Sequence, residues 1–435
     1  MISPKRPLTE PVACRTRRVS SPTINTIGHI EALDFIKQIE LAHSHNAEIL
    51  EELPAIVSRW LQQTTKEPAI LPKGTGRKWR ALLAARLAAR NLPISSITKV
   101  NFSSPLEITF HNIPFPPKEK PKFSFIDLFA GIGGFRIALQ DAGGVSLFSS
   151  ELDLHAKETY FENFGEIPFG DISKFSDDSA TLRGLASAIP HHDILAGGFP
   201  CQPFSQAGLQ RGFEDARGTL FFEILKIARK MRPKVIFLEN VKRLKTHDGG
   251  KTYALIENSL REIGYTVSSQ ILSAYDFGVP QNRERIFIVA SRDKRPFVFP
   301  SPTRVNGEVS VGRILERNVD DLYTISDRLL AGHKRRLEEH KRRGNGFGYS
   351  VFSDSALKVN TISARYWKDG SEVLIEQKGR NPRMLTPREC ARIQGFPDSF
   401  VIRQHRRHAY QQFGNSVAVP VIRAVASQIV EQYFR

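Results

Sequence analysis

Cysteine is scarce in this sequence, and the few cysteines present do not form pairs. The 435 residues include Cys14, Cys201 and Cys390, which lie far apart. A disulfide framework or a zinc site needs closely and regularly spaced ligands. The adjacent His191 and His192 have no further candidate ligands beside them, so two neighbouring histidines are best explained as a solvated turn. We therefore expect no metal and no disulfides, which suits a reducing cytoplasm.

Long apolar runs are also missing. No stretch approaches the roughly 18 consecutive apolar residues that a membrane span requires, so we expect no membrane association. The first residues are basic and rich in serine and proline, and they lack the apolar core of a secretory signal. We expect residues 1–28 to form a flexible basic tail. With 40% hydrophobic and 25% charged residues, the chain has the composition of a globular protein.

Acidic residues are outnumbered by basic ones. The sequence has 62 Lys and Arg against 45 Asp and Glu, a formal net charge of +17. Such a charge favours a polyanionic partner, because lysine and arginine release counterions when they bind phosphates. Nucleic acid is the leading candidate. An ordinary basic protein would show the same balance, so the motifs must decide.

The chain divides by its patterns. Residues 29–120 combine helical periodicity, an arginine-rich segment and a Pro- and Lys-rich linker; whether the arginines face phosphate or only solvent stays open. Six short apolar runs alternate with helical patterns in residues 121–294, which predicts an α/β domain. Basic runs and glycine loops fill residues 295–380 as an inserted domain, and residues 381–435 complete the first domain.

Three features of the α/β region indicate a nucleoside-binding crevice. An apolar strand runs directly into a turn with Gly131 and Gly133, where glycines let main chain approach a ligand. Glu151 follows the next apolar run and suits a ribose diol. Asp171 ends a further short segment, where it could accept a hydrogen bond from an adenine amine. Each feature alone also fits a tight turn, a helix cap or a solvated loop.

Reactive residues follow the later strands of this region. Cys201 stands in a Gly- and Pro-punctuated loop after an apolar run, and an exposed thiol held there differs from an inert core cysteine. Glu239 ends another apolar run, where burial would let it keep a proton to share. Arg283 and Arg285 alternate along the start of a strand and can present guanidinium groups to a site. Read singly, each charge is an ordinary surface residue.

The motifs DLFAGIGGFR, PCQPFS, ENV, QNRER, LTPRECARIQGFP and QQFGNSV occur in this order. Together they resemble the ordered motifs of bacterial cytosine C5 DNA methyltransferases, from about residue 123 to the C-terminus. The resemblance implies an α/β fold with a doubly wound, Rossmann-like sheet and a smaller target-recognition domain, which follow the N-terminal helical extension of this chain. It also implies transfer of a methyl group from S-adenosylmethionine, which leaves S-adenosylhomocysteine, to C5 of a cytosine flipped out of double-stranded DNA.

The resemblance also assigns roles to individual residues. Cys201 would be the nucleophile and Glu239 the acid at the ring nitrogen, while Arg285, helped by Arg283, would hold the base. The residues implied to bind the cofactor are Phe129, Gly131, Gly133, Glu151, Asp171, Pro200, Leu220, Asn415 and Ser416. Residues 202–218 would form a mobile loop that closes over DNA, with Gln202 and Ser205 in contact with it.

Target choice is expected in the inserted domain. Residues 359–375 resemble the recognition segment of methylases of the CC(A/T)GG and CCNGG group. Within that segment Thr361, Arg365, Tyr366 and Lys368 are the candidates for contact with base edges or phosphates.

The expected setting is a bacterial cytoplasm, with attachment to the nucleoid through DNA. We expect a monomer that serves a restriction-modification system, with a cognate restriction endonuclease as functional partner, or that acts as a solitary methylase. Two alternatives stay open: an RNA (tRNA) cytosine C5 methyltransferase with a similar core, and a DNA-binding regulator that acts through the N-terminal helices.

Overall fold

The structure, a computed structural model, describes residues 34, 36–38, 47–62, 78–79, 113–176, 188–200, 220–302, 309–344, 348–402 and 405–434. Some predictions fall outside these ranges. They are the basic tail of residues 1–28, most of the arginine-rich segment, and the loop of residues 202–218 together with Cys201.

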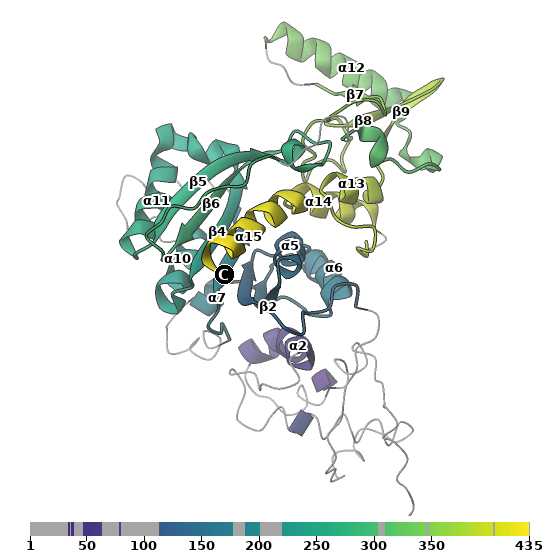
Figure 1. Cartoon of the computed structure of the whole chain (residues 1–435). Helices are drawn as coiled ribbons and strands as arrows, with labels where there is room; N and C mark the ends of the chain where they lie inside the picture. The colour runs from purple at the N-terminus through teal and green to yellow at the C-terminus, as the bar shows by residue number, and fades with distance from the viewer. Residues whose placement is uncertain are drawn as a thin grey trace, which may run out of the picture.

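A six-stranded sheet forms the centre of the molecule (Figure 1). Its strands are β1 (Phe123–Leu128), β2 (Gly144–Ser150), β3 (Ile194–Gly198), β4 (Val235–Val241), β5 (Thr266–Ser273) and β6 (Glu284–Ser291), in the order β2-β1-β3-β4-β6-β5. Each predicted apolar run forms one of them, and the α/β class is confirmed. β6 runs antiparallel to both of its neighbours, whereas β1 to β4 pair in parallel.

Helices cover both faces of the sheet, which is why strands such as β1, β3 and β4 are buried and largely apolar on both sides. Neighbouring residues of β4 point to opposite faces: Ile236 belongs to one buried cluster and Phe237 to the other. The first cluster includes residues of α10 (Leu220–Met231) and α11 (Lys251–Glu262). The second includes residues of α5 (Gly134–Asp141), α6 (Leu154–Phe164) and α15 (Val419–Tyr433). Short helices follow several strands: α7 (Ser173–Ser176), η2 (Lys242–Lys245), η3 (His247–Gly250) and η4 (Ala274–Phe277).

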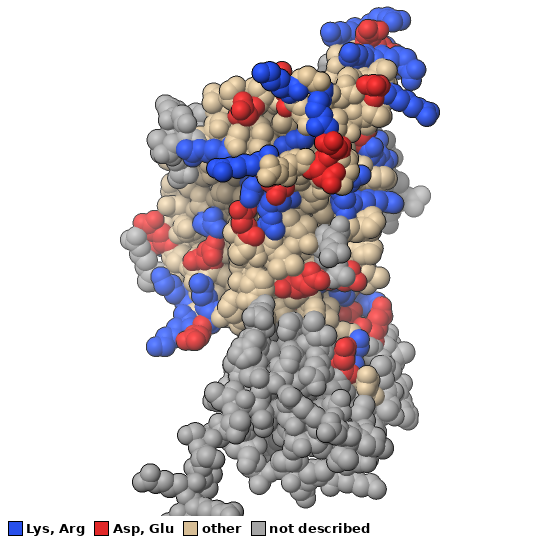
Figure 2. Space-filling view, turned by 90° about the vertical axis from the view of Figure 1, so that its right-hand side faces the viewer, with Lys and Arg blue, Asp and Glu red and all other residues tan. Residues whose placement is uncertain are grey.

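A second, smaller domain lies at one end of the molecule (Figure 1). It contains η5 (Val311–Arg313), η6 (Asp321–Tyr323), α12 (Asp327–Arg342) and a sheet of β7 (Val351–Phe352), β8 (Leu374–Gln377) and β9 (Arg380–Met384). β9 pairs with β8, so this sheet continues past the boundary expected at residue 380. Figure 2 shows Lys and Arg side chains gathered at the end of the molecule that carries α12, with few acidic ones among them.

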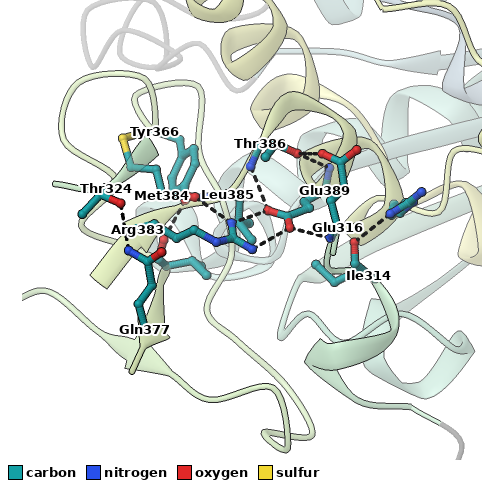
Figure 3. A network of polar contacts seen from close by, with 12 residues as sticks. Ile314, Glu316, Thr324, Tyr366, Gln377, Arg383, Met384, Leu385, Thr386 and Glu389 are labelled. Carbon is teal, nitrogen blue, oxygen red and sulfur yellow. Dashed lines mark hydrogen bonds and ion pairs between the residues drawn. The ribbon is translucent and has the colours of Figure 1, made fainter. Parts of the chain in front are cut away.

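A buried ion pair fastens the small domain to α13 (Pro387–Ile393) (Figure 3). The two terminal nitrogens of the Arg383 guanidinium donate to the Glu389 carboxylate, at 2.7 and 2.8 Å, and Glu389 is fully buried. The same carboxylate accepts the main-chain N–H groups of Thr386 and Glu316. The capping box of Thr386 and Glu389 begins α13 at this point. The buried carboxylate of Glu389 thus has both a charged partner and main-chain donors. These contacts fix the main chain where it passes from β9 into the large domain.

Helix α2 (Ala47–Gln62) lies within the predicted N-terminal helical region and packs at the opposite end of the molecule from α12 (Figure 1). Its buried residues Leu53, Ile56 and Trp60 join the same core cluster as Ile126 of β1. At the other end of the chain, α14 (Arg406–Asn415) and α15 lie in a stretch, Arg406–Tyr433, that is long and apolar enough to cross a membrane. More than half of its most apolar window is buried inside the protein, as in a core helix.

The Arg383–Glu389 pair supplies a stability prediction. In Glu389→Ala, Arg383 loses its partner in a buried setting, and the free energy of unfolding should fall by roughly 3–5 kcal/mol. Urea unfolding followed by circular dichroism measures the change. Asp141→Ala is the control, since Asp141 pairs with Arg423 where both side chains are more than 40% exposed, and it should cost roughly 0–1 kcal/mol. Equal losses in the two variants would contradict the role given to the buried pair.

Candidate active site

A cavity of about 600 Å³ opens at the edge of the large sheet where β1 to β4 end and β6 begins. Because β6 is antiparallel, its first residues meet the last residues of β4. The cavity therefore collects side chains from segments that are far apart in the sequence. Of the residues predicted for the site, its lining includes Phe129, Gly131, Glu151, Asp171, Pro200, Leu220, Glu239, Arg283, Arg285, Asn415 and Ser416.

The turn after β1 takes an unusual main-chain path. Phe129 and Gly131 both have positive φ angles, 56° and 55°, a region that side chains with a Cβ rarely adopt. A Cβ on Gly131 would meet no atom within 4 Å, so this residue leaves open space at the cavity. Gly133, with φ 89°, caps α5 and does not line the cavity; a Cβ there would lie 2.2 Å from Phe164. Gly133 thus shapes the turn by packing, and its predicted contact with the cofactor stays a prediction.

Glu151 ties this turn to the end of β2. One carboxylate oxygen accepts the N–H of Gly131 at 2.7 Å, and the other accepts those of Leu152 and Asp153 at 2.9 and 2.8 Å. A carboxylate has about four acceptor positions, so one remains for an incoming hydroxyl group. Fixed at the rim of the cavity, Glu151 can both hold the turn and accept from a ribose.

Glu239 and Arg285 meet at the end of β4. The Arg285 Nε lies 3.2 Å from Glu239 Oε1, and Glu239 is 8% exposed. Burial raises the pKa of Glu239, while the charges of Arg285 and Arg283 oppose the rise. The carboxyl group therefore holds a proton more readily than a solvent-exposed glutamate, beside a cation that can also orient a ligand. That combination fits a general acid.

Arg283 works mainly on the main chain around the cavity. Its guanidinium donates to the carbonyls of Ile362, Gly414 and Ser416, at 3.2, 3.2 and 2.6 Å. Burial and neighbouring Arg285 lower the pKa of this guanidinium. Arg283 thereby joins three segments: the start of β6, the recognition segment of the small domain and the turn between α14 and α15. Arg283 therefore both stabilises the main chain around the cavity and places a positive charge in its lining.

Asn240 fixes the exit of β3. Its amide donates to the Phe199 carbonyl at 2.9 Å, and its own side-chain oxygen accepts the N–H of Val241. The main chain entering Pro200, the last described residue before Cys201, is thus tied to the end of β4. Cys201, Gln202 and Ser205 themselves lie outside the described residues.

The four candidates of the recognition segment separate into two groups. Arg365 and Lys368 are exposed and line a second cavity of about 500 Å³ beside α12. Thr361 is partly buried, and its hydroxyl donates to the Asn282 carbonyl at 2.7 Å. The prediction for Tyr366 is wrong: its side chain is fully buried, and its hydroxyl donates to Val373 O and accepts Leu385 N–H. Tyr366 holds the domain together and cannot reach DNA.

Several lining residues escaped the sequence analysis. His408 and Gln412 reach the cavity from α14, where the Gln412 amide donates to the main chain of His155 on α6, 257 residues earlier. No local pattern in the sequence links these helices. Ile172 also lines the cavity. The sequence could have indicated this residue, because it is an apolar residue directly after the predicted site residue Asp171.

The residues present fit the expected cofactor. The cavity has the size of a small-molecule site, with apolar side chains (Phe129, Ile172, Leu220) and a few fixed polar groups (Glu151, Asp171). Its other end carries Glu239. An adenosine group and a reacting base could therefore occupy the same cavity.

Comparison with known proteins agrees with this geometry. The sequence model of the family described as C-5 cytosine-specific DNA methylase matches residues 123–431. Type II methyltransferase M.DsaV of Dactylococcopsis salina is 52% identical over 314 residues, covering 72% of this chain and 87% of that protein. Type II methyltransferase M1.ScrFI of Lactococcus lactis subsp. cremoris is 52% identical over 323 residues, covering 73% and 80%. The solved S. pombe Dnmt2 methyltransferase shares the fold, with a TM-score of 0.56 at 19% identity over 71% of this chain and 98% of that one.

Proposed function

Because the chain belongs to the C-5 cytosine-specific DNA methylase family, and so methylates cytosine in DNA with S-adenosylmethionine, we propose that Cys201, Glu239 and Arg285 carry out the reaction. The observation that supports this proposal is the buried Glu239 carboxyl, which has a raised pKa and lies beside Arg285. Both residues lie at the edge of the sheet where β3 ends, and Cys201 follows β3 in the sequence. Two relatives at 52% identity carry the name Type II methyltransferase, and the family is one of DNA methylases, which favours DNA over RNA as the substrate.

Each of the three residues has one task. The Cys201 thiolate adds to C6 of the cytosine, and the electron pair of the C5–C6 bond moves toward the ring nitrogen, where Glu239 supplies a proton. Arg285 holds the base by its carbonyl side. The sulfonium of the cofactor supplies the methyl group that C5 takes up. A base then removes the C5 proton, the returning electron pair expels the thiolate, and the ring nitrogen gives its proton back to Glu239.

The cofactor is held by residues that follow β1, β2 and β3, together with Asp171, the start of α10 and the end of α14. Glu151 accepts from one ribose hydroxyl, Asp171 accepts from the adenine amine, and Phe129 and Leu220 cover the apolar faces. The main chain at Gly131 and the groups of Pro200, Asn415 and Ser416 complete the pocket, while Gly133 acts through the shape of the turn.

DNA binds across the small domain and the opening of the cavity. Exposed Arg365 and Lys368 supply phosphate or base contacts, Thr361 supports the same segment, and Gln202 and Ser205 contact DNA from the loop of residues 202–218. The basic side chains near α12 in Figure 2 provide attraction for the phosphates. The resemblance of residues 359–375 makes CC(A/T)GG and CCNGG the first sites to test. The target base must leave the stack to reach Glu239, at a cost of a few kcal/mol.

The biological setting follows from the relatives' names. A type II methyltransferase protects DNA against a restriction endonuclease, and such an endonuclease would be this enzyme's functional partner. We propose that the enzyme works as a monomer in the bacterial cytoplasm, bound to the nucleoid through its DNA substrate.

Substrate choice is tested by methyl transfer. The purified protein is supplied with tritium-labelled S-adenosylmethionine and one of four substrates: duplexes with CCAGG, CCGGG or a scrambled site, or bulk tRNA. Label should enter the duplexes with a matched site, and bisulfite sequencing should place it on one cytosine of that site. Label in tRNA alone would favour the RNA alternative, and equal labelling of scrambled DNA would reject the proposed sites.

The acid role of Glu239 predicts a pH dependence. Its protonated form is lost as pH rises through its raised pKa, so methyl transfer in a single turnover should fall on the alkaline side. In Glu239→Gln the rate should drop by about 10²- to 10⁴-fold. The decrease in rate at alkaline pH that the titration of Glu239 causes should be absent from this variant. Glu284→Gln is the control, since Glu284 pairs with Lys242 on the surface one residue away from Arg285. Near-normal rates in Glu239→Gln would remove this residue from the mechanism.

A further inference from the structure

Helix α2 lies outside the residues that the family model matches, yet it packs directly behind the cofactor half of the cavity. Its apolar side chains share one buried cluster with Phe169 and Ile172. Ile172 lines the cavity itself. A helix N-terminal to the shared family domain is therefore separated from the cofactor pocket by a single layer of side chains.

Three polar side chains of α2 converge on one short segment, residues 166–170. The Glu52 carboxylate accepts the N–H of Gly170 at 3.0 and 3.1 Å. Ser58 Oγ accepts the N–H of Ile167 at 2.9 Å, and Arg59 forms an ion pair with Glu166 at 3.3 Å. Glu52 is 3% exposed and Ser58 1%, so these contacts are sealed from solvent. Two main-chain donors of this segment are thus satisfied by side chains from α2.

The opposite side of the same segment is held by β2. Phe169 N–H donates to the Ser149 carbonyl at 2.8 Å, and Glu151 N–H donates to the Phe169 carbonyl at 2.9 Å. The segment is therefore clamped between α2 and β2. Its next residues, Asp171 and Ile172, line the cavity, so any shift of the clamp moves them.

Gly170 is matched to the helix by shape. A Cβ at this position would lie 2.6 Å from Glu52 Oε1, closer than real contacts allow. The missing side chain lets the carboxylate reach the main chain. A larger residue at position 170 would have to displace the Glu52 carboxylate from the main chain.

The ion pair between Arg59 and Glu166 also connects α2 with the region of the turn after β1. Glu166 also accepts from Arg136 of α5 at 2.8 Å, and Arg136 is 1% exposed. Arg136 belongs to the helix that begins directly after the glycine turn of the cofactor pocket. Through Glu166, α2 is thus linked indirectly to the helix that follows the glycine turn.

We propose that α2 is a positioning element for the cofactor, in which Glu52 sets the main chain at Gly170 and so places Asp171 against the adenine. This proposal rests on the proposed role of Asp171. Glu52 touches neither cofactor nor DNA and acts only through the segment that it holds. The affinity for S-adenosylmethionine therefore depends on an N-terminal region outside the shared family domain.

The test uses the full-length protein and S-adenosylhomocysteine, with binding measured by isothermal titration calorimetry. Glu52→Ala should weaken this affinity by about tenfold, because Gly170 N–H loses a charged acceptor. DNA affinity without cofactor, and kcat at saturating S-adenosylmethionine, should stay within twofold of wild type. Glu52→Gln keeps an acceptor oxygen and should restore most of the affinity.

Glu51→Ala is the matched control. It makes the same charge change one residue earlier on α2 and removes only the exposed ion pair with Lys174. Its affinity for S-adenosylhomocysteine should equal that of wild type. If Glu52→Ala does not fold, Ser58→Ala, which loses the contact with Ile167, should show the same selective loss of affinity.

Two outcomes would overturn the proposal. One is wild-type affinity for S-adenosylhomocysteine in Glu52→Ala or, where that variant does not fold, in Ser58→Ala. The other is an equal loss of DNA and cofactor affinity, which marks a general structural role. Failure of the proposed function looks different, since Asp171→Ala would then bind S-adenosylhomocysteine normally while Glu52→Ala still weakened it.

Discussion

The antiparallel pairing of β6 with β4 brings the start of one strand to the end of the other, and there Arg285 meets Glu239 at 3.2 Å. A parallel β6 would place Arg285 at the far edge of the sheet. The pairing also brings in Arg283, whose hydrogen bonds hold the recognition segment and the turn before α15. One reversed strand thus joins the acid, the cation and both neighbouring segments at one cavity.

The same edge explains why the sites proposed for cofactor and base lie in a single cavity. Main chain leaving β1 and β2 is tied together by Glu151, and main chain leaving β3 is tied to β4 by Asn240. The main chain on both sides of the cavity is therefore tied across neighbouring strands. Helix α2 stabilises the first end from behind, and the Arg383–Glu389 pair fixes the entry of the small domain.

Much of this arrangement could be predicted from the sequence, because apolar runs and motifs report local structure. All six strands lie where the runs predicted them, and eleven of the predicted site residues line one cavity. Strand order, the reversal of β6 and the approach of α14 to α6 depend on long-range packing, which no local pattern encodes. Tyr366 was misplaced because its motif position does not reveal that its hydroxyl is used inside the domain. Gly133 supports the turn by packing against Phe164, a contact visible only once the fold is known.

The central claim is that a cysteine after β3 bonds to the target base while Glu239 supports the ring. A duplex with 5-fluorocytosine at the target tests this claim directly, because fluorine at C5 cannot leave as the proton does and the adduct persists. With S-adenosylmethionine present, the wild-type protein should form a complex that survives denaturation, and peptide mass spectrometry should place the bond on Cys201; Cys201→Ser should form none. A bond at another residue, or methyl transfer to ordinary DNA without any trapped complex, would contradict the account.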